Sequence, residues 1–128
     1  MSSKNLMAVL LNGVAQLEYD RSKQLTDFQS DYLDNMDVKM DNGISIGDQL
    51  IKNPDVMARV KFVTGNLLHS MKGNDEETTA AFCSYIATRM PDIKQIKIRD
   101  VEEETSIELV FDKEYRQQKT IPITMLNS

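Results

Sequence analysis

The stretch Gln95–Phe111, QIKIRDVEEETSIELVF, is where the hydrophobic period of the chain changes to two, and it decides the predicted fold class. Ile96 and Ile98 alternate with basic residues before the acidic run at 102–105, and the alternation resumes at Ile107. Strict alternation indicates strands that bury one face, and a short polar turn between two strands indicates antiparallel neighbours. We therefore predict a β-hairpin in this stretch.

A third strand is predicted further on, where residues 120–125, TIPITM, again place apolar side chains at alternate positions. Pro122 lacks a backbone donor, so this strand is expected at a sheet edge. The complete prediction for residues 94–126 is a three-stranded antiparallel β-meander. One face of the meander would pack on helices, and its other face would be exposed to water.

Helical periodicity predicts an N-terminal bundle of about five helices over residues 4–90. The segments are residues 4–18, 26–41, 45–52, 54–72 and 75–90. Capping residues, Thr26 and Asp75, begin two of them, and Gly73 ends the longest. Helices first and strands afterwards make an α+β fold, which we expect to form a single domain of residues 1–128.

Composition excludes several classes of protein. The chain has 128 residues, a net charge of −5 and one cysteine. A negative charge disfavours nucleic acid and anionic membranes as partners, because both require basic surfaces. A lone cysteine cannot form an internal disulfide, which favours the cytoplasm. The apolar run Leu6–Leu11 is too short for a membrane span or a signal peptide, so we assign it to the first helix.

Catalysis by a cysteine–histidine pair would require Cys83 and His69, the single residues of each kind. On the helix at 54–72, His69 lies about 200° around from Leu67 and therefore points to solvent. Cys83 lies in the middle of the next helix, among apolar residues, where burial favours the neutral thiol. We expect a packed cysteine and an exposed histidine, and no catalytic residues.

Metal and cofactor sites are also not predicted. One cysteine and one histidine cannot form a closed zinc site within one chain. The segment 37–49 superficially resembles a calcium loop, but placing Gly43 at position 6 puts Val38 and Met40 at ligand positions. The glycines never form a phosphate-binding motif.

The acidic residues of the second predicted helix form the one pattern in the sequence that suggests a functional surface. They repeat at helical spacing on a face opposite the apolar stripe that we expect to run from Phe28 through Tyr32 to Met40. The acidic residues are Asp27, Asp31, Asp34, Asp37 and Asp41. Like charges at this spacing repel one another, so a helix selected for stability alone would interleave lysines.

Two interpretations of this acidic face remain open. It could have a function, as a docking face for a basic protein centred on Asp31, Asp34 and Asp37 or as a loose site for a divalent ion. It could equally be an ordinary solvated face, answered in part by cations such as Arg21 or Arg59.

The leading functional hypothesis is a small acidic cytoplasmic protein that is not an enzyme and acts as a regulatory, adaptor or accessory factor through protein contacts. The alternative is a small-molecule-binding protein or enzyme with a carboxylate-lined pocket between helices and sheet, using Tyr32, Tyr85 or Arg89. A weaker alternative is an acidic mimic of nucleic acid that inhibits a basic enzyme. A strand at the edge of the sheet could also pair with a second copy of the chain.

Overall fold

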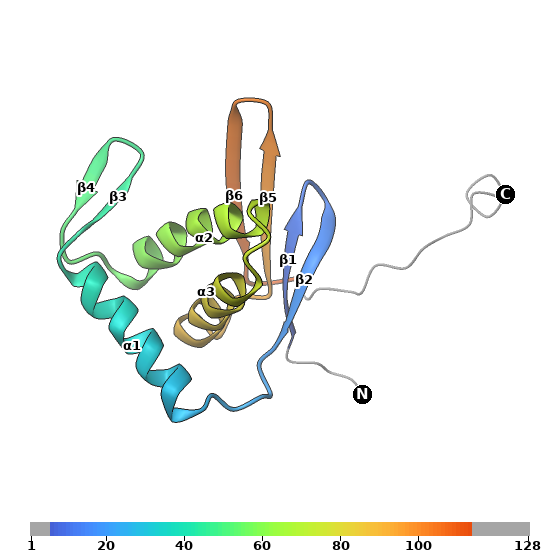
Figure 1. Ribbon diagram of the computed structural model, residues 1–128. Coiled ribbons are helices and arrows are strands. Elements are labelled where there is room, and N and C mark those ends of the chain that lie inside the picture. Colours follow the sequence, from blue (N-terminus) through green and yellow to red (C-terminus); the bar gives the residue numbers. More distant parts are fainter. Residues whose placement is uncertain (1–5, 114–128) are drawn as a thin grey trace, which may run out of the picture.

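The computed structural model describes residues 6–113, which form three helices and six strands (Figure 1). In chain order these are β1 (Leu6–Leu11), β2 (Val14–Asp20), α1 (Asp27–Asp41), β3 (Ile44–Ile46), β4 (Gln49–Ile51), α2 (Val56–Lys72), α3 (Glu76–Arg89), β5 (Gln95–Val101) and β6 (Glu104–Val110). The fold is α+β, but the predicted five-helix bundle followed by a three-stranded meander is wrong.

The main sheet is mixed and has the strand order β2-β1-β5-β6. Strand β1 pairs antiparallel with β2 and parallel with β5, and β5 pairs antiparallel with β6. The two central strands of the sheet, β1 and β5, therefore come from early and late parts of the described chain. All three helices lie between β2 and β5 in the sequence.

The first predicted helix, residues 4–18, is wrong because Asn12 and Gly13 form a hairpin turn between β1 and β2. Both have positive φ, 51° and 85°, a combination typical of two-residue hairpin turns. Residues 7–10 of the central strand β1 are all buried, so side chains on both of its faces are covered and the run Leu6–Leu11 lacks the alternation of a half-buried strand. Asn12 also exchanges side-chain hydrogen bonds with the backbone of Asp100, at 3.2 and 2.8 Å.

The short helix predicted for residues 45–52 is also wrong. Strands β3 and β4 form a separate hairpin there, with Gly47 at a φ of 61° in the turn. This hairpin projects beyond the end of α1 (Figure 1).

The three longer predicted helices are confirmed as α1, α2 and α3, and their caps follow the sequence. The N-cap Thr26 of α1 accepts a hydrogen bond from the Gln29 backbone at 3.1 Å, and the Gln29 side chain accepts one from the Thr26 backbone at 2.9 Å. Asp55 and Asp75 cap α2 and α3 in the same way, through one backbone hydrogen bond each.

The predicted hairpin of β5 and β6 is confirmed, with a tighter turn than expected. Glu102, at a φ of 52°, and Glu103 form the turn, and the next two residues already belong to β6. The meander is wrong because the strand on the other side of β5 is β1. The predicted strand at 120–125 lies outside the described residues.

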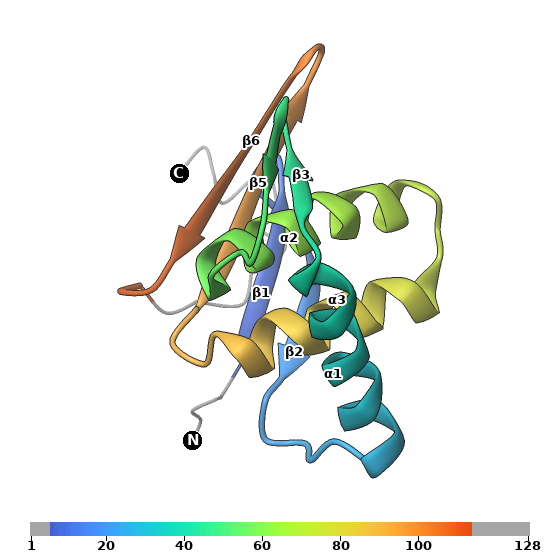
Figure 2. The same ribbon diagram turned by 90° about the vertical axis from the view of Figure 1, so that its left-hand side faces the viewer.

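The helices form two further layers beside the sheet. Helices α2 and α3 cover one face of the sheet, and α1 lies on the far side of these two helices (Figure 2). One continuous core contains Val60 and Leu67 of α2, Ile86 of α3, and Ile96 of β5, all completely buried. No helix in the described part of the chain is long and apolar enough to cross a membrane.

Candidate functional site

Asp37 of α1 joins the three helices through its carboxylate. The Tyr85 hydroxyl and Arg59 Nη1 donate to Oδ1 at 2.5 and 3.1 Å, and Arg89 Nε donates to Oδ2 at 2.8 Å. Burial alone would raise the pKa of Asp37, but hydrogen bonds from Tyr85, Arg89 and Arg59 outweigh it and leave the pKa below its usual value. Asp37 is therefore ionised at neutral pH and tethers α1 to α2 and α3.

The same two arginines pair with neighbouring aspartates. Arg59 Nη2 lies 2.6 Å from Asp41 Oδ1, and Arg89 Nη2 lies 2.9 Å from Asp34 Oδ1. Both arginine side chains are mostly covered, at 14% and 25% exposure. Three of the five predicted site aspartates thus meet cations of the same chain. Arg59 was among the bases expected to answer them, whereas Arg89 was expected in a ligand pocket.

The other two predicted site residues lie apart from this network. Asp27 and Asp31 are exposed in the first half of α1. Within residues 6–113, neither carboxylate forms an ion pair or a side-chain hydrogen bond. The acidic face is therefore two regions, one neutralised by arginines and one open to solvent.

The apolar stripe predicted for α1 is wrong in its N-terminal half. Leu33 and Met40 are the buried residues of this helix, whereas Phe28 is 79% exposed and Tyr32 is 44% exposed. The packed face contains Asp37, because the two arginines and Tyr85 satisfy its charge there. Sequence reasoning placed every aspartate in solvent, which rotated the expected core face toward Phe28 and Tyr32.

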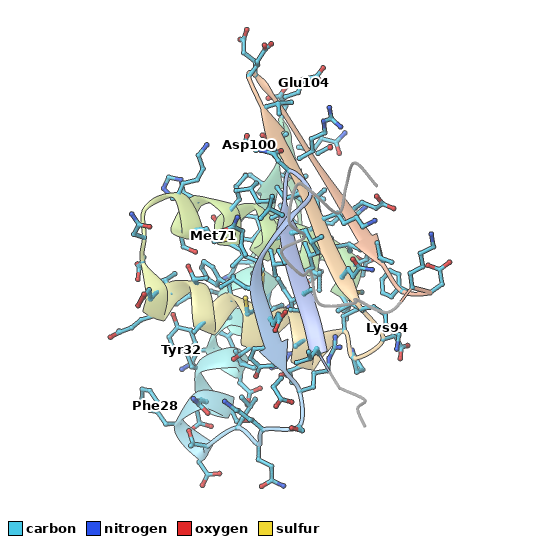
Figure 3. All side chains as sticks on the ribbon, turned by 90° about the vertical axis from the view of Figure 1, so that its right-hand side faces the viewer. Phe28, Tyr32, Met71, Lys94, Asp100 and Glu104 are labelled. Carbon is cyan, nitrogen blue, oxygen red and sulfur yellow. The ribbon has the colours of Figure 1, made fainter. Side chains whose placement is uncertain are left out.

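The two exposed aromatic residues flank a groove of about 440 Å³ between α1 and α3. Phe28 and Tyr32 line one side, and Glu77, Ala80 and Ala81 line the other. Figure 3 shows Phe28 at the outer margin of the molecule, with Tyr32 one turn further along α1. We refer to this feature as the α1–α3 groove.

A second cleft, of about 560 Å³, lies on the other side of α3, between this helix, β2 and the end of α2. Met71 and Cys83 contribute to it, and Ala80 lines both this cleft and the α1–α3 groove. Its acidic lining residues are Glu18, Asp75 and Glu76. We refer to this feature as the β2–α3 cleft.

The expected burial of the cysteine and exposure of the histidine are confirmed. Cys83 is 4% exposed, and burial raises the pKa of its thiol to about 12. His69 is exposed on α2. A thiol with this pKa is protonated at neutral pH, so Cys83 lacks the thiolate that nucleophilic catalysis requires.

The residues proposed for the alternative ligand pocket are separated in the structure. Tyr85 and Arg89 contact Asp37, whereas Tyr32 lines the α1–α3 groove. No group of three or more histidine, cysteine, aspartate or glutamate side chains among the described residues could hold a metal ion.

No protein-family model matches the chain, and comparisons with curated proteins and with solved structures give no significant match.

Proposed function

We propose that this protein is a cytoplasmic adaptor or regulatory factor, without enzymatic activity, that binds a protein partner in the α1–α3 groove. The exposure of Phe28, at 79%, carries the proposal. Burying a phenylalanine side chain is worth roughly 1.5–3 kcal/mol, and the fold leaves most of that stabilisation unused. Aromatic residues beside a groove are typical anchors of protein interfaces.

Tyr32 strengthens the proposal. Its side chain lies one helical turn from Phe28 on the same side of α1, and its hydroxyl has no hydrogen-bond partner among residues 6–113. A tyrosine with a free hydroxyl can offer a partner both apolar area and a polar contact.

The groove is also held in a fixed shape. The capping box of Thr26 and Gln29 orders the start of α1, and the Asp37 network fixes its second half on α2 and α3. Phe28 and Tyr32 therefore project from a helix whose first turn is capped and whose second half is held on α2 and α3. Preorganisation of this kind lowers the entropy lost on binding.

This proposal is tested by capturing partners from the source cells with three tagged proteins. The first is the wild type, and the second carries Phe28→Ala and Tyr32→Ala. The third carries Val38→Ala and Leu50→Ala, which remove other exposed apolar side chains, 61% and 63% exposed, that do not line the groove.

The proposal predicts a protein that is retained by the wild type and by the Val38/Leu50 control but is lost with the Phe28/Tyr32 variant. Retention of every bound protein by the Phe28/Tyr32 variant contradicts the proposal. Loss with both variants would also contradict it, because the effect would then not be specific to the groove.

The β2–α3 cleft supports a second candidate function, small-molecule binding. It lies between helices and sheet and contains Glu18, Asp75 and Glu76, as the alternative hypothesis requires. A thermal-shift screen with a panel of metabolites tests this function. A ligand of the cleft should raise the Tm of the wild type. It should not raise the Tm of an Ala80→Trp variant, because the indole would fill part of the cleft beside α3. A panel with no hit would remove the support for this candidate.

A further inference from the structure

We infer that the partner of the α1–α3 groove is a basic amphipathic helix whose apolar side chains enter the groove and the adjoining β2–α3 cleft. This inference rests on the proposed function and adds the chemistry of the partner.

The charge around the two depressions is negative on the α3 side. Asp75, Glu76 and Glu77 follow one another at the start of α3 and line the clefts. A helix N-terminus carries about half a positive charge, which offsets only a fraction of three carboxylates. Hydrogen bonds from the Thr78 hydroxyl and backbone lower the pKa of Asp75, so that carboxylate is ionised at neutral pH.

No lysine or arginine lines either depression within the described part of the chain. On the α1 side, Asp31 precedes Tyr32 and is exposed without an ion pair to any described residue. The carboxylates that line the groove and the cleft therefore come mainly from the start of α3, and Asp31 adds an exposed charge on the neighbouring surface of α1. A partner with lysines or arginines would complement this charge and would be attracted to the surface at long range.

The apolar surface of the groove and the cleft is shaped to receive a helix. Ala80 forms a low ridge on α3 between the two depressions, with Phe28 and Tyr32 on the groove side and Met71 on the cleft side. Small side chains on a ridge let another helix approach closely, and the depressions on either side can receive its larger apolar residues. An amphipathic helix presents such residues at positions i, i+3, i+4 and i+7.

Other acidic regions lack this combination. Asp34, Asp37 and Asp41 are paired with arginines. The acidic turn at 102–104 lies at the tip of the β5–β6 hairpin, where Figure 3 shows Glu104 at the far end of the molecule from Phe28. The α1–α3 groove joins exposed aromatic side chains to unneutralised acids, so we assign the basic partner to it.

The probe for this inference is a fluorescent peptide of about 18 lysines and leucines, with leucines at the helical spacing given above. Two matched peptides control for charge and pattern. One replaces every lysine by glutamate, and the other has the same composition in scrambled order. Fluorescence anisotropy with the full-length protein measures the Kd of each.

The lysine peptide should bind at least about ten-fold more tightly than either control, and its affinity should fall in about 1 M salt, where exposed charges are screened. The Phe28→Ala and Tyr32→Ala variant should lose most of this binding. Equal binding of the glutamate peptide, or unchanged binding by the Phe28/Tyr32 variant, overturns the inference.

A matched pair of charge variants locates the acidic contribution. Glu76→Gln with Glu77→Gln should weaken the lysine peptide by about five-fold, since two exposed charge contacts are lost. Glu103→Gln with Glu104→Gln makes the same change in net charge at the distant turn and should leave the Kd unchanged. Equal weakening by both pairs would show a general charge effect and would contradict the assigned site. Thermal unfolding of each variant confirms that it is folded.

Failure of this inference can be distinguished from failure of the proposed function. A cellular partner that requires Phe28 and Tyr32, together with no binding of the lysine peptide, rejects the basic helix and retains the groove. If the Phe28/Tyr32 variant still binds both the cellular partners and the lysine peptide, the proposed function and this inference are both rejected.

Discussion

The two halves of α1 have similar acidity and opposite roles in the structure. In the second half, Asp34, Asp37 and Asp41 meet Arg59 and Arg89 and hold the helix on its neighbours. In the first half, acidic and aromatic side chains face solvent and make no ion pair with any residue of the described part. A regular repeat of one residue type therefore does not imply one function along a helix.

This comparison changes how the acidic face should be probed. Reversing the charges of Asp34 and Asp37 would place positive side chains against Arg59 and Arg89, so lost binding could simply report unfolding. Asp31 has no such role, and substitutions there test recognition alone. The variants below are ordered by the size of the expected effect on stability.

Among the substitutions of polar residues, Asp37→Asn should produce the largest effect, a loss of about 2 kcal/mol in the free energy of unfolding. The amide keeps the size of the carboxylate but removes its charge and turns a donor toward Arg89 or Arg59. Asp31→Asn is the matched control in the other half of α1 and should change stability by less than about 0.5 kcal/mol. Urea unfolding measures both. Equal losses would contradict the division of α1 into two halves.

Arg59→Lys should reduce stability by about 1 kcal/mol. The guanidinium contacts Asp37, Asp41 and the Pro54 carbonyl at once, at 3.1, 2.6 and 2.9 Å, and a single ammonium cannot reproduce that geometry. Lys39→Arg, on an exposed position of α1, is the control and should be neutral. Thermal and urea unfolding should give the same loss of stability. Unchanged stability of Arg59→Lys would contradict this prediction, because a positive charge alone would then be enough to hold Asp37 and Asp41.

The contribution of Asp37 should depend on pH in one direction. Its pKa is lower in the folded protein than in the unfolded chain, so its stabilisation is complete above the unfolded value of about 4 and is lost as pH falls through the folded pKa. The gap in unfolding free energy between wild type and Asp37→Asn should therefore be constant near neutral pH and narrow below about pH 4. A gap that widens in acid would contradict the ionised state of Asp37.

Phe28→Ala with Tyr32→Ala should have a smaller effect on stability than the two network variants, below about 1 kcal/mol, because Phe28 is mostly exposed and Tyr32 is about half exposed. Leu33→Ala, on the packed face of the same helix, should cost about 2–4 kcal/mol in comparison. Urea unfolding distinguishes these cases. A large loss for Phe28/Tyr32 would show that they support the fold and would remove them as binding anchors.

Much of the helical part of the fold could be predicted from the sequence, because caps and stop signals are local. Thr26 and Asp75 act in the structure as the N-caps that their residue types indicate, and α2 ends at Gly73 as expected, although the left-handed residue after this helix is Asn74. The β5–β6 hairpin could be predicted for the same reason, since alternation and a polar turn are both local patterns.

The central strand β1 could not be recognised from periodicity, because burial on both faces removes the alternation on which strand prediction depends. The signal that was present is Asn12-Gly13, a strong indicator of a hairpin turn, which was outweighed by a chance helical spacing of leucines. The parallel pairing of β1 with β5 joins segments far apart in the chain, and no local pattern encodes it.

The candidate site was predicted in part. The acidic repeat is visible in the sequence, but its partners Tyr85 and Arg89 come from a helix about 50 residues away. Without them Asp37 is expected in solvent, and the exposure of Phe28 and Tyr32 cannot be foreseen. Partly buried ion pairs between distant segments therefore limited the prediction of which face of α1 packs.

The most direct test of the division of α1 is an amide NMR titration of the isotope-labelled protein with the lysine–leucine peptide. We expect shifts in residues 27–33 of α1 and 75–84 of α3, with little change in residues 34–41 or in the turn at 102–104. Shifts concentrated in residues 34–41, or spread evenly over every acidic surface, would contradict the assignment of recognition to the first half of the helix.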